Sequence, residues 1–330
     1  MHFLQSALLL VTAWVSLAHA LSSPPSGALV VSKSPSSGQY KSVQAAVNAL
    51  SKSSSSKQTI FIEAGTYSEQ VLVPSLSGPL AIYGSTSDSG SYKSNTVTIT
   101  HAAGQSDGLN NDQTGTLRVM TSKFSLYNVN VVNSKGQGTQ AIALSAQAGQ
   151  QGYYGVSLKG YQDTLLAQTG AQVYAKSYIE GAVDFVFGQH GQVWIHDCDI
   201  GVSAGGGYVI ASGRNSSSEN SWYVIDSSRI QAASGKSVSS GSTYLGRPWG
   251  LYARAVVQKS TLSSIINSAG WSMWNKGDER TANAYLAEYS NTGAGASGQR
   301  ASFSRKLSSA VDITTVLGSS YESWADKSYL

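Results

Sequence analysis

The chain has 330 residues with a formal net charge of +4, and only 12% of its residues are charged. This length allows one large domain or two small ones. The charged fraction is about half of the roughly 25% usual for a soluble domain, so Ser, Thr, Asn, Gln and Gly must supply much of the polar surface. The sequence contains no Lys/Arg-rich run, which argues against a nucleic-acid partner.

The first twenty residues have the pattern of a secretory signal peptide. An apolar run from Leu8 to Leu17 ends in Ala18-His19-Ala20, a small-x-small cleavage site. We therefore predict a signal peptide over residues 1–20 and a single secreted domain over residues 21–330, with a buried N-terminal helix as the alternative to the signal peptide. The apolar run is too short and interrupted to span a bilayer, so no membrane partner is expected.

Two further features agree with export. Asn215-Ser216-Ser217 is an N-glycosylation acceptor, and Cys198 is the only cysteine. A single cysteine cannot form an internal disulfide, so packing alone must hold the exported chain together, which favours an extensive, repetitive core. Because Cys198 lies in an apolar segment, we expect a buried small side chain and not a nucleophile.

One helix is expected near the start of the mature chain, followed by short strands. Val43, Val47 and Leu50 recur at helical spacing within Tyr40–Leu50. After this segment the sequence shows only short β-type runs separated by Gly, Asn and Ser, without the long alternating helices of a doubly wound sheet. The clearest predicted strands are Ile60–Ile62, Val97–Thr100, Val129–Val132, Ala141–Leu144 and Val256–Val257.

A weak internal repeat runs through these strands. Each copy has an apolar residue, a polar or small stretch and then an aliphatic residue, and two successive copies end at Ile179 and Ile200, 21 residues apart. A strand-bearing unit of this length, with variable insertions and no helices, predicts an all-β solenoid, a parallel β-helix of one domain. A β-sandwich is the alternative, but its tight two-residue hairpin turns are scarce here. The copies are 126–131, 174–179, 195–200, 225–230 and 257–262.

Two aspartates lie in apolar surroundings, Asp163 within 161–166 and Asp184 within 182–188. A buried carboxylate must be paired, hydrogen-bonded or protonated, and such groups are enriched at functional sites; a structural ion pair or a turn aspartate is the alternative. Asp163 and Asp184 are 21 residues apart. One coil would place them on neighbouring rungs about 4.8 Å apart, where one carboxyl should keep its proton.

Other polar residues share this spacing. Gln140 and Gln162 are 22 residues apart, which predicts two side-chain amides on successive rungs of the same face. Arg247 lies 63 residues beyond Asp184, close to three coils of 21. Its guanidinium could hold one aspartate ionised and oriented. The spacing therefore predicts an acid and an anion side by side, with amides and a cation next to them.

Five blocks resemble, in order, the signature blocks of the pectin methylesterases. The resemblance implies a right-handed parallel β-helix that removes methyl esters from polygalacturonan, with no cofactor and no metal. Glu69, in the first block, is expected to be structural. The blocks are Gly65–Glu69, Gln140–Leu144, Tyr161–Leu165, Asp184–Gly188 and Leu245–Trp249.

The resemblance also implies roles for individual residues, and it shows departures. Many relatives carry an aromatic where this chain has Leu166, so one substrate contact is expected to be missing or replaced. Plant members often have several cysteines and a long N-terminal inhibitor-like region; this chain has neither, which suggests the fungal or microbial type. The implied roles are nucleophile (Asp184), acid and then base (Asp163), oxyanion hole (Gln140 and Gln162), orienting arginine (Arg247) and groove-lining aromatics (Trp249 and Phe187).

The candidate residues also suit ester hydrolysis when the family resemblance is set aside. An ester carbonyl attacked by a carboxylate develops negative charge on oxygen, which amide donors stabilise by about 3–4 kcal/mol each. A protonated carboxyl beside it can give its proton to departing methanol and then activate water. The resemblance adds methylated pectin as the expected partner, and we expect a secreted, monomeric esterase.

Other functions fit less well. Gly104–Gly108 matches the G-x-S-x-G motif of serine hydrolases, but a loop-type segment follows it where that motif needs a helix. Gly136–Ala141 loosely matches a dinucleotide fingerprint without a crossover helix. The histidines outside the signal have no metal-ligand spacing.

Another polysaccharide enzyme on the same fold is the main alternative, because two carboxylates about 5 Å apart also suit a retaining glycosidase. The paired glutamines favour an ester carbonyl. A calcium-dependent lyase would need a larger acidic cluster than Asp197 and Asp199. A non-catalytic wall-binding protein would leave the two aspartates and Arg247 unexplained.

Overall fold

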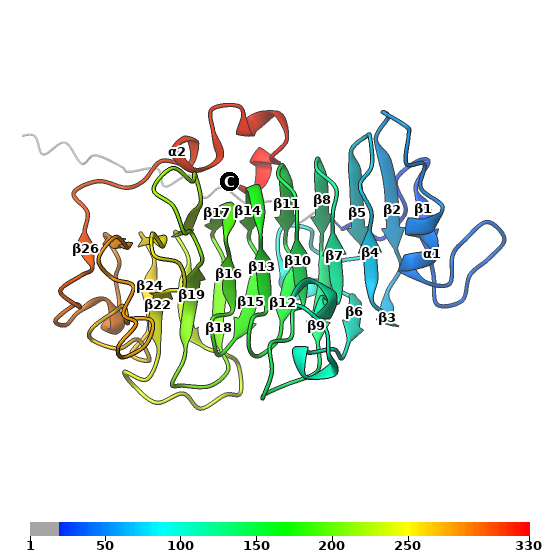
Figure 1. Ribbon diagram of the computed structural model, residues 1–330. Helices are drawn as coiled ribbons and strands as arrows, with labels where there is room; N and C mark the ends of the chain where they lie inside the picture. Colours follow the sequence, from blue (N-terminus) through cyan, green and yellow to red (C-terminus); the bar gives the residue numbers. More distant parts are fainter. Residues whose placement is uncertain (1–19) are drawn as a thin grey trace, which may run out of the picture.

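Short parallel strands stack along one axis in the computed structural model, which describes residues 20–330 (Figure 1). The predicted signal peptide lies outside the described residues except for Ala20. Within the described part, the strands form three sheets. Sheet 1 contains β1 (Leu29–Val31), β2 (Gln58–Ile62), β5 (Leu80–Gly84), β8 (Phe124–Tyr127), β11 (Gln151–Tyr154), β14 (Thr169–Ala175), β17 (His190–His196), β20 (Trp222–Asp226), β23 (Arg254–Gln258), β25 (Tyr285–Tyr289) and β26 (Arg305–Lys306).

The other two sheets complete each coil. Sheet 2 contains β3 (Gly65–Ser68), β6 (Val97–His101), β9 (Val129–Asn133), β12 (Ser157–Lys159), β15 (Tyr178–Gly181), β18 (Asp199–Val202), β21 (Arg229–Ala232) and β24 (Thr261–Leu262). Sheet 3 contains β4 (Val71–Val73), β7 (Leu117–Val119), β10 (Leu144–Ala146), β13 (Leu165–Ala167), β16 (Val186–Gly188), β19 (Tyr208–Ser212) and β22 (Tyr244–Pro248).

The chain visits the three sheets in turn, so β11, β12 and β13 form one coil and β14, β15 and β16 the next. The paired strands of these coils are parallel. This arrangement confirms the predicted right-handed parallel β-helix. It rules out the β-sandwich, which requires antiparallel hairpins.

The strand register confirms the predicted repeat. Tyr174 pairs with Ile195 in sheet 1, and Ile179 pairs with Ile200 in sheet 2. One copy was not recognised in the sequence, 153–158, in which Tyr153 pairs with Tyr174. Its turn residue is Gly155, with φ of 57°, where the neighbouring copy has Lys176 at 49°. The left-handed turn between sheets 1 and 2 is therefore repeated from coil to coil.

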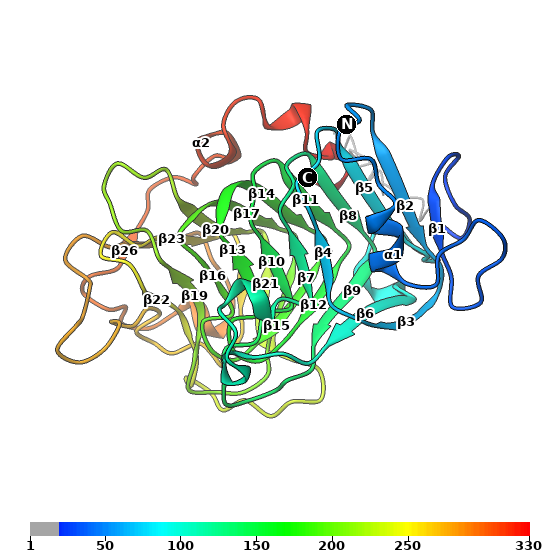
Figure 2. The same ribbon diagram turned by 45° about the vertical axis from the view of Figure 1, so that its right-hand side comes forward.

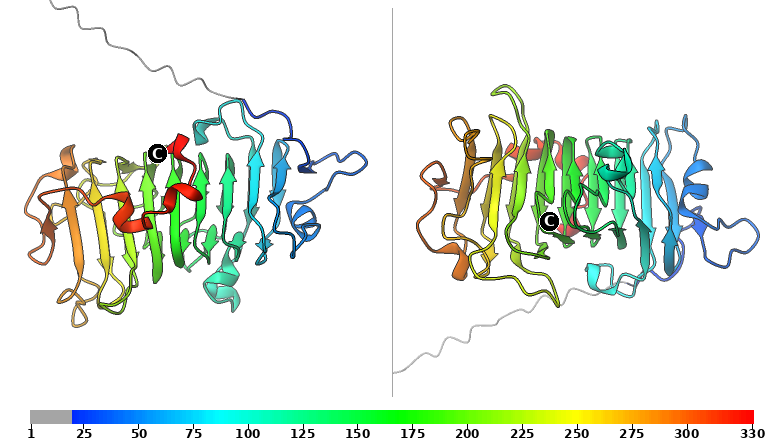
Figure 3. Two further views of the ribbon diagram at one scale, coloured as in Figure 1. Left: turned by 90° about the horizontal axis from the view of Figure 1, so that it is seen from above. Right: turned by 60° about the horizontal axis from the view of Figure 1, so that its bottom comes forward.

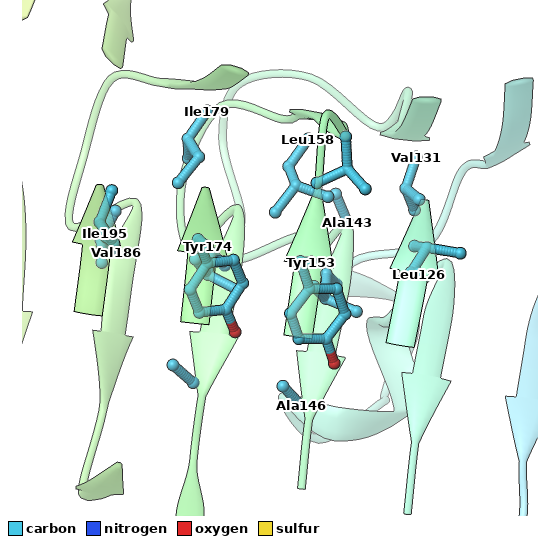
Figure 4. Close-up of a cluster of buried hydrophobic side chains, with 14 of the residues drawn as sticks. Leu126, Val131, Ala143, Ala146, Tyr153, Leu158, Tyr174, Ile179, Val186 and Ile195 are labelled. Atoms are coloured by element: carbon cyan, nitrogen blue, oxygen red, sulfur yellow. The ribbon is translucent and has the colours of Figure 1, made fainter. Parts of the chain in front are cut away.

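The core is a column of side chains between the three sheets (Figure 4). Tyr153 and Tyr174 stack in it with ring centroids 4.8 Å apart and both fully buried. Their hydroxyls donate to the side chains of Gln151 and Gln172, at 2.9 and 2.7 Å, which satisfies these buried polar groups. Cys198 is also buried, as expected, and burial raises the pKa of its thiol to about 12.

The N-terminal helix is present but shorter than predicted. Helix α1 spans Val43–Asn48 and packs at the blue end of the stack (Figure 2), against β1, β2 and β4. Ser42 caps it by accepting from the amide of Ala45 at 3.1 Å. Glu69 accepts from the amides of Val43 and Gln44, at 2.8 and 2.9 Å, which supports the structural interpretation of this residue.

Helix α1 ends early for a local reason. The side chain of Gln58 bonds both the amide and the carbonyl of Ser51, each at 2.8 Å. These bonds hold the chain beyond Leu50 in a non-helical turn. Leu50 still packs into the core, which explains its helical spacing in the sequence.

A second helix was not predicted. Helix α2 (Ile313–Leu317) belongs to a C-terminal segment that folds back across sheet 1 (Figures 1 and 3). Gln192 of β17 donates to the carbonyl of Val316 at 2.9 Å, and the hydroxyl of Tyr154 accepts from the amide of Asp326 at 2.8 Å. Five residues are too few for a periodic pattern to reveal the helix. Short 3₁₀ turns occur at Tyr92–Ser94, Gln105–Asp107, Asp112–Thr114, Ala294–Ala296, Tyr321–Ser323 and Lys327–Tyr329.

Four of the five predicted strands lie within β2, β6, β9 and β23. The prediction for Ala141–Leu144 is wrong, because only Leu144 belongs to a strand, β10. The amide of Ile142 donates to the hydroxyl of Thr114 at 3.2 Å, and its carbonyl accepts from the side chain of Asn133 at 3.0 Å. The same carbonyl also accepts from the backbone amide of Thr116 at 3.0 Å. The turn is therefore held by side-chain and backbone bonds together.

Candidate active site

The candidate site lies on sheet 3, and its two glutamines and two aspartates lie in the turns that precede the strands. Gln140 and Gln162 pair as equivalent positions of successive coils, and Gln162 pairs in the same way with Val183. The residues that follow Gln162 and Val183 are Asp163 and Asp184, so these two are equivalent as well. The spacings of 21 and 22 residues therefore correspond to single coils, as predicted.

Both aspartates have the same unusual backbone conformation. Their φ angles are 65° for Asp163 and 49° for Asp184, in the left-handed region that Asp tolerates better than most residues. The amide of Asp163 donates to the carbonyl of Val183 at 3.1 Å, which ties the two turns together. Because the turns are alike and are stacked on adjacent rungs, the two carboxyl groups are presented on the same face.

Arg247 of β22 holds Asp184 in a two-point fork. Its Nε donates to Oδ1 at 3.0 Å and its Nη2 to Oδ2 at 2.6 Å. Two parallel bonds from a guanidinium fix both the charge and the orientation of a carboxylate. Arg247 therefore restricts Asp184 to one geometry in the site.

The coil count that led to Arg247 was wrong. In sheet 3 the order is β16, β19, β22, so Arg247 lies two coils beyond Asp184 and not three. The loops at 203–207, 213–221 and 233–243 lengthen these two coils to a total of 63 residues. The side chains meet because insertions between strands leave the strand register unchanged.

Asp163 has a different environment from Asp184. Only 7% of its surface is exposed, and it has no arginine fork of its own. Burial and the neighbouring negative charge of Asp184 raise the pKa of Asp163 well above its usual range, and the Arg247 charge opposes this rise only partly. Asp163 therefore favours the protonated form beside an oriented carboxylate.

A cavity of about 250 Å³ contains these groups. All seven residues to which the sequence assigned a catalytic or groove-lining role lie on its wall. Among the described residues, the side-chain amides of Gln140 and Gln162 have no hydrogen-bond partner, so they can donate into the cavity. The lining residues are Asn111, Gln140, Gln162, Asp163, Asp184, Phe187, Ala211, Arg247, Trp249 and Trp274.

Aromatic rings form one side of the cavity. Trp249 and Phe187 lie with ring centroids 6.1 Å apart and their planes tilted by 58°. Leu166 packs with Phe187 in the apolar cluster beneath them. A side chain at Gly213 would come within 2.4 Å of the Trp249 ring, so glycine is needed there for the indole to lie against the coil.

Three lining residues were not predicted from the sequence: Asn111, Ala211 and Trp274. Trp274 follows Trp271 in a polar segment, and this pair of tryptophans was the signal available for it. Asn111 precedes a 3₁₀ turn in the long connection between β6 and β7, in the coil next to that of Gln140. No local pattern places it at the cavity.

An oriented carboxylate, a carboxyl that keeps its proton and two unpaired amide donors are the groups needed to attack an acyl carbon and stabilise the resulting oxyanion. Their placement on the outer face of a parallel β-helix indicates the class, a hydrolase with its candidate reacting groups on successive coils of one solenoid.

Known proteins agree with this class. Residues 28–313 match the family model Pectinesterase. The chain is 50% identical over 318 residues to a pectinesterase of Aspergillus niger, covering 96% of each chain, and 49% identical over 330 residues to a pectinesterase of Aspergillus aculeatus, covering 99% and 98%. It superposes on the crystal structure of the pectin methylesterase from Aspergillus niger in deglycosylated form with a TM-score of 0.88, at 43% identity, covering 94% of this chain and 100% of that one.

The chain belongs to the pectinesterase family and is a carboxylic ester hydrolase. Within residues 20–330, no cluster of three or more His, Cys, Asp or Glu side chains has the arrangement of a metal site. The same residues include no helix that is both long and apolar enough to cross a bilayer.

Proposed function

We propose that this enzyme hydrolyses the methyl esters of pectin, releasing methanol and pectate, with Asp184 as the nucleophile and Asp163 as the acid and base. The observation that carries this proposal is the pairing of an arginine-held carboxylate with a neighbouring carboxyl of raised pKa. The family supports pectin as the substrate. Sequence identity to pectinesterases along nearly the whole chain supports the same reaction.

The reaction would proceed in two halves. One oxygen of the Asp184 carboxylate attacks the ester carbonyl carbon, and the carbonyl oxygen, now negative, accepts hydrogen bonds from Gln140 and Gln162. The bond to the methoxy group then breaks. The proton of Asp163 moves to the leaving oxygen and gives methanol. The products of this half are an acyl-aspartyl anhydride and an ionised Asp163.

The second half restores the enzyme. The ionised Asp163 takes a proton from water, and the hydroxide attacks the galacturonyl carbon of the anhydride. The bond to Asp184 breaks, so Asp184 leaves as a carboxylate and Asp163 is again protonated. Arg247 keeps Asp184 in line in both halves, and Trp249 with Phe187 forms the wall along which the sugar chain lies.

Methanol release from highly methylated pectin is the direct test. We expect methanol from the first minutes, while the viscosity of the solution stays nearly constant because no glycosidic bond is cut. Both quantities should be measured on one sample. New reducing ends without methanol would move the reaction to glycoside cleavage.

The same assay tests whether the activity needs a bound metal ion. Activity should survive dialysis against EDTA, because the proposed chemistry uses only side chains. Loss with EDTA and recovery with calcium would contradict this mechanism. Added salt is expected to change the rate without such recovery, since the product is a polyanion and the enzyme is basic.

We also propose that the chain is exported, with cleavage after Ala20, and that Asn215 carries a glycan. Asn215 is exposed, and its Oδ1 accepts from the amide of Leu251 at 3.2 Å. This bond leaves Nδ2, the atom that a glycan would modify, without a partner among the described residues. A monomeric state stays a prediction.

Expression in a secreting fungal host would test both points. The protein in the medium should begin at Leu21 and should carry extra mass on the peptide that contains Asn215. Ser217→Ala should remove this mass, whereas Ser217→Thr, which preserves the acceptor motif, should keep it. Both substitutions retain the Ser217 carbonyl that accepts from Arg214 at 2.6 Å. Secreted protein that begins at Met1, or an unmodified Asn215 peptide, would contradict the proposal.

A further inference from the structure

Two aromatic rings enclose the guanidinium of Arg247. Its central carbon lies 4.1 Å from the ring centroid of Tyr208 and also 4.1 Å from that of Trp274. Its edge is occupied as well, because Nε and Nη2 donate to Asp184, and Nη1 donates to the carbonyl of Trp274 at 3.2 Å. Aromatic rings therefore contact both faces of the guanidinium, and each of its three nitrogens donates a hydrogen bond.

The two rings come from different parts of the coil. Tyr208 belongs to β19 and stacks on Tyr244 of β22, with centroids 5.7 Å apart. Trp274 lies in the loop after β24, outside the described strands. The ring on one side is thus part of sheet 3, while the other belongs to a loop that must be fixed by its own contacts.

The loop that carries Trp274 is fixed by hydrogen bonds. The amide of Trp274 donates to the carbonyl of Glu279 at 3.0 Å, and Asn275 and Asp278 exchange two backbone bonds of 3.1 Å. Gly277, with φ of 86°, allows this tight turn. The loop therefore has a defined shape of its own.

Arg280 attaches this loop to the wall of the cavity. Its guanidinium donates to the carboxylate of Asp278 and to the backbone carbonyl of Trp249. The same group lies 5.1 Å from the Trp274 ring, on which it forms a second cation–π contact. The position of Trp274 is consequently tied to that of Trp249.

These contacts matter because a free arginine side chain is mobile. A guanidinium over an aromatic face gains a cation–π attraction, and that attraction is stronger when water is excluded. Holding the planar fork in advance also avoids the rotamer entropy that Arg247 would otherwise lose at each encounter with substrate. The direction of the Asp184 carboxylate depends on that fork, and small errors in attack geometry have large effects on rate.

We propose that Trp274, together with Tyr208, is a positioning residue for the esterase reaction: the two rings fix Arg247, and through it the line of attack of Asp184. This role goes beyond forming a wall for the sugar, and it rests on the proposed nucleophile. The loop 274–280 is therefore a working part of the site.

Substitutions of Trp274 distinguish the positioning role from two simpler roles, contact with the pectin chain and stabilisation of the fold. Trp274→Leu removes the aromatic face, and Trp274→Phe keeps one. The matched control is Trp222→Leu, because the guanidinium of Arg254 lies 4.1 Å over the Trp222 ring in sheet 1, away from the cavity. Each variant would be assayed on pectin and on a short neutral methyl ester, with kcat and KM determined separately.

We expect Trp274→Leu to lower kcat about tenfold on both substrates, while KM for the short ester changes little. Trp274→Phe should restore most of the rate, and Trp222→Leu should leave both constants unchanged. A rise in KM on pectin alone, with kcat preserved, would show that Trp274 only contacts the polymer. A lower melting temperature with unchanged kcat would show a structural role only. Either result overturns the proposal.

The pH profile adds an independent readout. The charge of Arg247 lowers the pKa of Asp163, against burial and Asp184, which raise it. If Trp274→Leu lets the guanidinium move away, that opposition weakens and the pKa of Asp163 rises further. The alkaline limb of kcat/KM on the short neutral ester should therefore shift to higher pH in Trp274→Leu. An unshifted limb would contradict the positioning role.

A double-mutant cycle with Arg247→Lys completes the test. An ammonium cannot form the two-point fork, so Trp274→Leu should cost much less in the Arg247→Lys background than in the wild type. Equal costs in both backgrounds would overturn the proposal. If Trp274→Leu does not fold, Tyr208→Leu provides the same test from the other face.

Failure of this inference is distinguishable from failure of the proposed function. Trapping an acyl group on Asp184 during turnover uses the wild type and does not involve Trp274. A trapped intermediate together with an unaffected kcat in Trp274→Leu would remove only the positioning role.

Discussion

Asp184→Asn is expected to reduce turnover by roughly 10³-fold or more while the fold remains intact. An amide oxygen is a far weaker nucleophile than a carboxylate, and a neutral amide at this position could not balance the charge of Arg247. Methanol release under saturating pectin measures the loss, and circular dichroism checks the fold. Retention of more than a tenth of the activity would mean that Asp184 is not the nucleophile.

The chain offers a matched control for this substitution. Asp197 also has a left-handed backbone, with φ of 48°, but it is exposed and lies in the turn before β18. Asp197→Asn therefore makes the same chemical change in the same kind of turn, away from the cavity. Its activity should equal that of the wild type.

The covalent step can be observed in the wild type. Rapid acid quenching during turnover should trap an acyl group on the peptide that contains Asp184, detectable by mass spectrometry. Asp197 provides the internal comparison, since its peptide should stay unmodified. A methanol burst with no acyl group on the Asp184 peptide would indicate direct attack by water, with Asp184 as its base.

Asp163→Asn is expected to act in opposite directions on activity and on stability. Activity should fall about 10²- to 10⁴-fold, the usual contribution of a general acid and base. The alkaline limb of the wild-type profile on a neutral methyl ester, which reports loss of the Asp163 proton, should disappear from the residual activity. An alkaline limb that survives unchanged in Asp163→Asn would assign it to another group.

The stability effect follows from the raised pKa of Asp163. In the unfolded chain this carboxyl ionises near its ordinary value of 3.8, whereas the folded protein keeps the proton to higher pH. Between these two pKa values the unfolded state binds fewer protons, so the free energy of unfolding falls as pH rises and levels off above the folded-state pKa. An asparagine side chain does not ionise in either state, so the variant would not incur this loss.

The melting temperature of Asp163→Asn should therefore exceed that of the wild type at neutral pH. Each unit by which folding raises the pKa corresponds to about 1.4 kcal/mol. The difference should vanish as the pH falls below about 3.8, where both states of the wild type are protonated. Thermal unfolding of both proteins across this range is the measurement. A variant less stable than the wild type at neutral pH would contradict the assigned ionisation.

Much of this architecture could be predicted because a solenoid repeats local rules. The spacing of Asp163 and Asp184 identified one coil, and hydrogen-bonded pairing between coils then forces equivalent positions into line. Gln140 and Gln162 followed by the same rule. The family resemblance added the roles, which spacing alone could not assign.

The remaining features depend on contacts that spacing does not encode. Arg247 reaches Asp184 across two coils that are lengthened by loops. Counting residues therefore predicted the correct face of the solenoid for Arg247, but it placed this residue three coils beyond Asp184 and not two. Trp274 and Asn111 lie in loops, whose positions are set by bonds such as that between Arg280 and the Trp249 carbonyl. Ile142 has strand-like neighbours in sequence, but its amide donates to the Thr114 hydroxyl, and its carbonyl accepts from the Asn133 side chain and the Thr116 amide.

The two ends of the stack differ from its middle in a way that affects solubility. A sheet edge exposes unpaired backbone groups and can template the addition of another chain. At one end α1 covers the coil that includes β1, and at the other β26 is only two residues long, both exposed and both basic, Arg305 and Lys306. A short charged strand repels an identical copy of itself. The covered end and the short charged end therefore both leave little free edge on which another chain could extend the ladder.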